Sequence, residues 1–75
     1  MKLLGYKYIR RKSLANKWLD EVSVEFEKTY KVMKAEMSDG VIRYQMKIVG
    51  KGFITISDFL YEQFFKEVEN ETISN

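Results

Sequence analysis

The chain of 75 residues contains no histidine, no cysteine and no proline. Histidine is the commonest general base and metal ligand near neutral pH, and cysteine is the most reactive nucleophile and the other main soft ligand. Their absence argues against a zinc module and against most classes of enzyme. We therefore expect a protein that works by binding, with no catalytic residue, no metal and no cofactor.

Long apolar runs are missing as well, so no segment is expected to span a membrane, and the first residues do not resemble a signal peptide. The absence of cysteine removes the disulfide argument for secretion, and we expect a cytoplasmic protein. At this length we expect a single domain over residues 1–70, followed by a frayed tail over residues 71–75.

Positive charge is concentrated near the N-terminus, although the net charge is only +2. Residues 1–17 carry six basic side chains and no acidic one, whereas the rest of the chain carries all eleven acids. Such asymmetry is typical of contact with an anionic partner.

Residues 3–10 alternate in character and are rich in β-formers, which predicts a strand, although Gly5 weakens it. Ser13 is a suitable N-cap for a helix that runs to about Lys28. Apolar residues recur at helical spacing over this stretch. Residues 22–28 also alternate as a strand would, and this alternative stays open.

A turn is predicted at Asp39-Gly40, which separates two β-rich runs. If these two residues form the whole loop, Met37 lies opposite Ile42 and Met33 lies opposite Met46. One face of the hairpin is then wholly apolar. Since a slip of one residue would turn every side chain to the other face, this pattern predicts a well-defined register.

A second hairpin follows, with Gly50-Lys51-Gly52 as its loop. This loop places Ile48 opposite Ile54 and Met46 opposite Ile56, again on the apolar face. A last helix is then expected from Ser57 or Asp58 to Val68.

The predicted order is β-α-β-β-β-α, which indicates an α+β two-layer sandwich. It consists of a three-stranded antiparallel meander, with or without an N-terminal edge strand, and two helices on one face. The predicted core contains Leu14, Trp18, Leu19, Val22, Phe26, Met33, Met37, Ile42, Tyr44, Met46, Ile48, Ile54, Ile56, Leu60, Phe64 and Val68.

Two surfaces are candidates for contact with a protein partner, because exposed apolar patches and aromatic side chains mark interfaces. On the outer side of the predicted sheet these residues are Tyr30, Val32, Val49 and Phe53. On the last helix they are Phe59, Tyr61 and Phe65, which would also suit a homodimer. Burial by other parts of the chain is the competing interpretation for both groups.

The basic aromatic N-terminal segment is the candidate for binding nucleic acid, since tyrosine stacks on bases and arginine binds phosphates. Its residues are Tyr6, Lys7, Tyr8, Arg10, Arg11, Lys12 and Lys17. An edge strand that carries lysine and arginine to prevent aggregation is the alternative.

The proline-free composition, rich in lysine, glutamate and tyrosine, resembles that of small accessory proteins of low-GC bacteria and their phages. We expect a non-enzymatic protein-binding domain, such as a regulator or inhibitor from a phage or mobile element. The alternative is a small DNA- or RNA-binding protein that uses the N-terminal segment.

Overall fold

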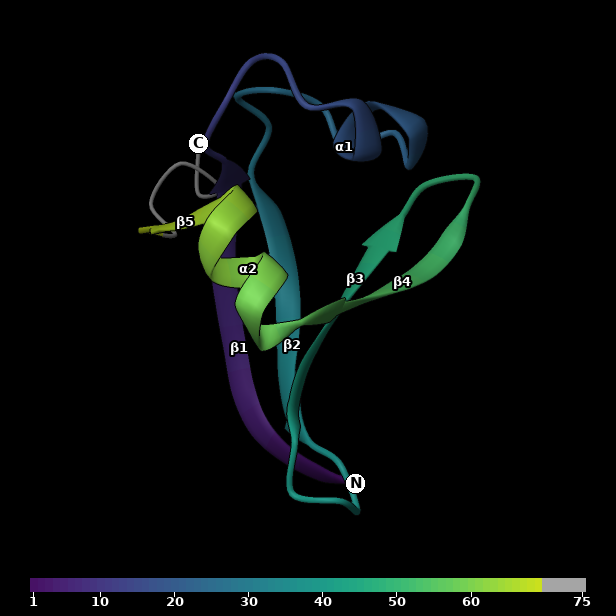
Figure 1. Ribbon diagram of the computed structural model, residues 1–75, viewed down its shortest axis with the longest axis vertical. Helices are drawn as coiled ribbons and strands as arrows, with labels where there is room; N and C mark the ends of the chain where they lie inside the picture. Colours follow the sequence, from purple (N-terminus) through teal and green to yellow (C-terminus); the bar gives the residue numbers. More distant parts are fainter. Residues whose placement is uncertain (70–75) are drawn as a thin grey trace.

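Five strands and two short helices make up the computed structural model, which describes residues 1–69 (Figure 1). Along the chain they are β1 (Lys2–Arg11), α1 (Lys17–Glu21), β2 (Tyr30–Glu36), β3 (Ile42–Ile48), β4 (Gly52–Ser57), α2 (Asp58–Phe64) and β5 (Phe65–Val68). The strands form one antiparallel sheet in the order β4-β3-β2-β1-β5. The predicted α+β class is confirmed. The predicted tail, residues 71–75, lies outside the described residues.

The sheet is larger than the predicted meander, because two further strands join it. β1 pairs with β2 along most of its length, and its last four residues also pair with β5. β1 is therefore an interior strand and not the edge strand that the sequence suggested.

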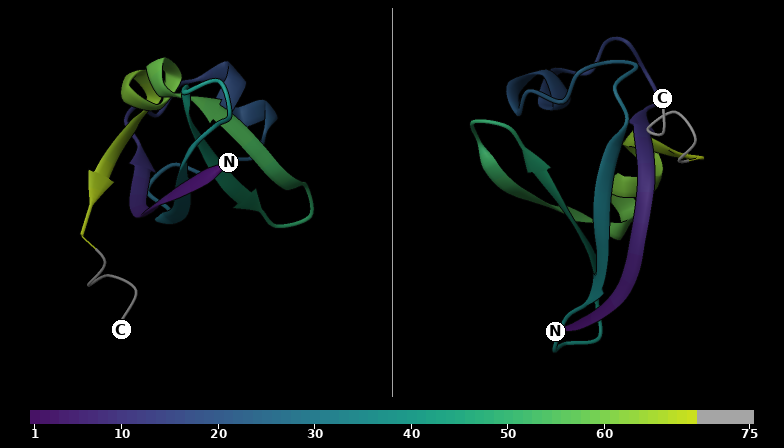
Figure 2. Two further views of the ribbon diagram at one scale, coloured as in Figure 1. Left: turned by 90° about the horizontal axis from the view of Figure 1, so that it is seen from below. Right: turned by 180° about the vertical axis from the view of Figure 1, so that it is seen from behind.

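Both helices pack on one face of the sheet, as predicted. In Figure 1 α2 lies in front of β1 and β2, and in the rear view of Figure 2 it lies behind them. Leu19 of α1 and Tyr61 of α2 belong to the same buried cluster as Ile9, Val32 and Met46 from the sheet. The helices and the inner side of the sheet thus enclose a single core.

The first helix is much shorter than predicted. Its N-cap is Asn16 and not Ser13, and the Asn16 side chain accepts a hydrogen bond of 3.0 Å from the Leu19 amide. Helix α1 ends at Glu21, and residues 22–29 form neither helix nor strand. Ser23 and Glu27 have φ angles of 65° and 67°, which belong to neither regular structure. Neither interpretation of residues 22–28 was therefore right.

The irregular segment also changes which side chains are buried. Val24 is almost fully buried in the core, whereas Leu14 and Phe26, both predicted core residues, are exposed. A continuous helix would have brought Leu14 and Phe26 onto the apolar side of one cylinder. The break after Glu21 removes that geometry and turns Val24 inward instead.

The register between β2 and β3 differs from the prediction by one residue. Val32, and not Met33, lies opposite Met46. The turn does contain Asp39-Gly40, but the connection is longer than two residues, because the Met37 amide donates to the Val41 carbonyl at 2.9 Å. The slip turns β2 over, so Tyr30 and Val32 face the core and Met33 faces outward.

The register between β3 and β4 differs by two residues, which leaves the faces unchanged. Met46 lies opposite Ile54 and Tyr44 lies opposite Ile56, and the loop is Val49–Lys51. Since side chains alternate along a strand, a shift of two residues keeps the apolar side of this hairpin facing inward.

The last helix starts where expected, and the Ser57 hydroxyl accepts a hydrogen bond of 3.2 Å from the Leu60 amide. It ends earlier than predicted, at Phe64. Residues Phe65–Val68 form β5 and pair with the end of β1, so the predicted helix was four residues too long at its C-terminal end.

The core is built mainly from residues on the inner side of the sheet. Its buried apolar members are Ile9, Leu19, Val24, Tyr30, Val32, Ala35, Tyr44, Met46, Ile48, Ile56, Tyr61 and Phe65. Several predicted core residues pack against it while partly exposed, namely Trp18, Val22, Ile42, Ile54, Leu60 and Phe64. Neither helix within residues 1–69 is long and apolar enough to cross a membrane.

Candidate nucleic-acid interface

The side of the sheet that faces away from the helices is called the outer face here. Residues paired directly across antiparallel strands share a face, so the pairing identifies its members. They are Leu3, Tyr6, Tyr8, Arg10, Lys31, Met33, Ala35, Arg43, Gln45, Lys47, Phe53, Thr55, Ser57, Lys66 and Val68.

The charge on the outer face is of one sign. Five of its strand positions are basic, Arg10, Lys31, Arg43, Lys47 and Lys66, and none is acidic. Within residues 1–69 the aspartates and glutamates lie instead in the β1–β2 connection, which includes α1, at inward strand positions, in the β2–β3 turn, in α2 and directly after β5. The outer strand positions thus carry cations and no anion, although Glu25 and Glu27 of the β1–β2 connection line hollows beside some of these cations.

An open hollow of about 410 Å³ lies on the outer face and spans strands β1 to β4. Its lining consists of Tyr6, Lys31, Met33, Gln45, Lys47 and Phe53. Two of these residues are aromatic and unusually accessible, since Tyr6 is 52% exposed and Phe53 is 70% exposed. The hollow combines aromatic surface with two ammonium groups.

Lys31 and Tyr6 are in contact within this hollow. The Lys31 ammonium lies 4.5 Å from the centroid of the Tyr6 ring, which is a cation–π distance. Across the hollow, Lys47 is paired directly with Phe53. Each of the two aromatic side chains that line the hollow, Tyr6 and Phe53, therefore has a lysine beside it.

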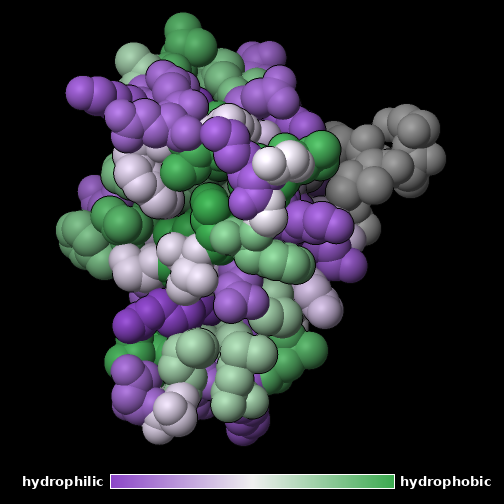
Figure 3. Space-filling model, turned by 90° about the vertical axis from the view of Figure 1, so that its right-hand side faces the viewer, coloured by the Kyte–Doolittle hydropathy of each residue, from purple (hydrophilic) through white to green (hydrophobic). Residues whose placement is uncertain are grey.

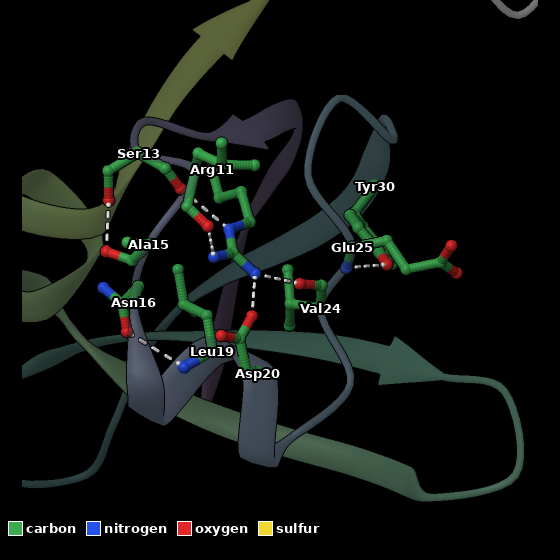
Figure 4. Close-up of polar contacts among 10 residues, drawn as sticks. Arg11, Ser13, Ala15, Asn16, Leu19, Asp20, Val24, Glu25 and Tyr30 are labelled. Carbon is green, nitrogen blue, oxygen red and sulfur yellow. Dashed lines mark hydrogen bonds and ion pairs between the residues drawn. The ribbon is translucent and has the colours of Figure 1, made fainter.

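Arg11, one of the predicted nucleic-acid contacts, is instead buried, with 2% of its surface exposed. Its guanidinium donates to Asp20 Oδ1 at 2.8 Å and to three backbone carbonyls, those of Ser13 (3.0 Å), Leu14 (2.7 Å) and Val24 (2.6 Å) (Figure 4). These bonds satisfy the charge and fix the irregular β1–β2 connection. Arg11 is thus a structural residue and is not available to a phosphate.

The other basic residues of the N-terminal segment are divided among different surfaces. Arg10 lies on the outer face, and its Nε donates to Thr29 Oγ1 at 2.9 Å. Lys12 donates to the Glu62 carbonyl at 2.6 Å, and Lys17 lies on α1, away from the outer face. Lys7 is exposed but occupies an inward strand position opposite Val32. The two tyrosines of the segment, Tyr6 and Tyr8, are both on the outer face.

The residues predicted to contact a protein partner are also divided. Tyr30, Val32, Tyr61 and Phe65 are buried in the core, so for these four the competing interpretation, burial within the chain, is the right one. Tyr30 and Val32 are buried because of the one-residue slip of β2. Tyr61 is buried because α2 packs it against Tyr44, and Phe65 because the chain returns to the sheet as β5.

The remaining three predicted contacts are exposed, with Val49 at 86%, Phe53 at 70% and Phe59 at 71%. Figure 3 shows the side of the molecule from which the β3–β4 hairpin projects, where apolar residues gather in the middle between hydrophilic regions. Phe53 lies on this hairpin and on the outer face, whereas Phe59 lies on α2.

A stacked tyrosine pair lies on the inner side of the sheet. The rings of Tyr44 and Tyr61 are 3.6 Å apart and nearly parallel, and the Tyr61 hydroxyl donates to Glu67 Oε2 at 2.9 Å. Burial, and then this hydrogen bond, raise the pKa of the Tyr61 phenol, while burial and the nearby Asp58 raise the pKa of Tyr44. Both phenols are held in their protonated form, which suits a structural role.

Within residues 1–69 no group of three or more acidic side chains is arranged to hold a metal ion. No protein-family model, curated protein or solved structure matches this chain. The function is therefore inferred from the chain's own residues.

Proposed function

We propose that the protein binds nucleic acid through the outer face. The observation that carries this proposal is the charge of the strand positions on that face, five of which are basic and none of which is acidic. A surface of one sign attracts a polyanion, and phosphate contacts supply most of the affinity in non-specific nucleic-acid binding.

Protection of sheet edges does not explain these cations. Lysine and arginine often occur on edge strands, where they prevent pairing with another chain. Lys31 lies on β2, and Arg43 and Lys47 lie on β3, and both strands have neighbours on each side. A role in contacting a ligand accounts for their position, whereas an anti-aggregation role does not.

The proposal is tested by fluorescence anisotropy with a labelled oligonucleotide at low salt. Replacing Arg43 and Lys47 together with glutamine should weaken binding about tenfold, because two phosphate contacts are lost. Lys17→Gln is the matched control, since it removes one cation from α1 and should leave the affinity close to that of the wild type. If Lys17→Gln weakens binding and the double variant binds as tightly as the wild type, the binding surface lies on the β1–β2 connection instead.

A protein-binding domain is the second candidate, and the observation in its favour is the exposure of Phe53 and Phe59. Large aromatic side chains are enriched at interface cores, where truncation of one can cost about 2 kcal/mol or more in affinity. A regulator or inhibitor of phage or mobile-element origin, acting in the cytoplasm, stays a prediction from the sequence, as does a homodimer. Sedimentation of Phe53→Ser and Phe59→Ser against the wild type tests self-association on each side of the molecule.

A further inference from the structure

We propose that the ligand is single-stranded, and that Tyr6 and Phe53 stack on its unpaired bases in the hollow of the outer face. This inference rests on the proposed function and specifies which form of nucleic acid the surface recognises. Stacking of bases on aromatic side chains, together with a positively charged groove, is the general mode by which single strands are bound.

The position of the two rings favours a single strand over a duplex. Tyr6 lies on β1 and Phe53 on β4, so at least three strand spacings, or about 14 Å, separate their strands across the sheet. One base cannot reach both rings, and each ring therefore holds a different nucleotide. In a duplex the bases are already stacked and paired, so their flat surfaces are unavailable to either ring.

A lysine lies beside each ring: Lys31 over one face of Tyr6, and Lys47 paired with Phe53. A base stacks on Tyr6 either at the opposite face of the ring or after the Lys31 ammonium has moved from the ring to a phosphate. Met33 adds apolar lining between the two ends, and the Gln45 amide offers both a donor and an acceptor to a base edge. The hollow thus repeats one arrangement, an aromatic surface with a cation beside it, at two points.

Exposure of these rings also calls for an explanation in energetic terms. A chain of this size buries only about 60% of its unfolded surface, so each large apolar side chain that enters the core adds significantly to its stability. Leaving Tyr6 and Phe53 half or more exposed forgoes that gain. Phe59 is equally exposed, and what distinguishes Tyr6 and Phe53 is that both line the hollow, each with a lysine beside it.

The experiment compares four labelled or competing probes of equal length: a single strand, the same sequence as a duplex, an abasic strand with the same number of phosphates, and inorganic polyphosphate. The single strand should bind at least about tenfold more tightly than the abasic strand, because only the single strand offers bases for stacking. Polyphosphate should compete weakly and the duplex less well than the single strand.

Variants assign this preference to the two rings. Tyr6→Leu and Phe53→Leu should each weaken single-strand binding about tenfold while leaving abasic-strand binding and the salt dependence unchanged. Phe59→Leu is the matched control, since it removes an equally exposed phenylalanine from α2 and should change nothing. Circular dichroism of each variant checks the fold, and Phe53 is exposed enough for its replacement to leave the fold intact.

Equal affinity for the intact and the abasic strand, or a duplex bound as tightly as the single strand, would overturn this inference and leave the proposed function standing. Binding to none of the four probes at low salt would overturn both. Equal losses with Phe59→Leu and Phe53→Leu would also overturn the inference, because the hollow would then have no special role.

Discussion

Replacing Arg11 with methionine should remove a large part of the protein's stability. The arginine is 2% exposed, and its guanidinium bonds to one carboxylate and three backbone carbonyls of the β1–β2 connection (Figure 4). Methionine has a similar length and fills much of the same space, so the change tests the hydrogen bonds more than the packing.

The expected loss follows from the groups that are left behind. The carboxylate left behind, Asp20, is 63% exposed and is solvated by water, whereas the three backbone carbonyls each lose a charged donor. A buried carbonyl without a donor costs about 1–3 kcal/mol. We therefore expect a loss of at least about 3 kcal/mol. A domain of this size has a total stability of about 4–11 kcal/mol, so Arg11→Met should be only marginally folded.

The matched control is Asp20→Asn, which removes the ion pair but leaves the guanidinium and its three carbonyl bonds. Asp20 is 63% exposed, and such a pair contributes less than about 1 kcal/mol. Urea denaturation followed by circular dichroism measures both variants. A loss below about 1 kcal/mol in Arg11→Met, or equal losses in the two variants, would refute the structural role of the buried guanidinium.

Three further predictions concern other parts of the molecule. Stability should fall as the pH rises above about 10, because the unfolded chain releases the Tyr61 proton at its ordinary pKa while the folded chain retains it; urea midpoints of Tyr61→Phe should depend less on pH in this range. Gly40→Val should lower stability by about 1 kcal/mol or more, since Gly40 has a φ of 83°, and an unchanged melting temperature would contradict the turn geometry. Phe59→Ser should change the free energy of unfolding by less than about 0.5 kcal/mol, and a collapse of the fold would show that Phe59 packs internally.

The strands could be predicted from the sequence where local signals agree. The alternation of β3 and β4 identifies Tyr44, Met46, Ile48 and Ile56 as core residues, and an error of two residues in the register leaves them facing inward. The same reasoning failed for β2, because the true connection at Asp39-Gly40 is longer than two residues, and an error of one residue reverses the faces.

The helices were predicted less well, because helical spacing alone does not show where a helix ends. Apolar residues recur at helical spacing from Leu14 to beyond Glu21, but the helix itself ends at Glu21. Ser23 turns the backbone there, and Val24 packs inward. In the last helix, the helical spacing of apolar residues likewise extends beyond Phe64 into the residues that form β5. Pairing of β5 with β1 joins residues far apart in the chain, which local periodicity does not report.

The candidate site was only partly visible in the sequence. Tyr6, Tyr8 and Arg10 were identified from the basic aromatic N-terminal segment, and Phe53 was identified as an exposed aromatic residue. Lys31 and Met33 were missed because the predicted β2 was turned over. The alternation of Tyr30 and Val32 with Lys31 and Met33 was the signal that could have corrected this. If Tyr30 and Val32 are assigned to the core, Lys31 and Met33 fall on the outer face. Arg11 was misassigned because its sequence neighbours do not reveal that it is buried.

The central claim is that the outer face binds nucleic acid through its phosphates, and the salt dependence of affinity tests it most directly. The logarithm of the wild-type binding constant for a single-stranded oligonucleotide should fall linearly with the logarithm of the salt concentration. The Arg43→Gln, Lys47→Gln double variant should show a slope that is shallower by about 1.4, at about 0.7 for each lost contact. An identical slope and affinity in the double variant and the wild type would contradict the claim.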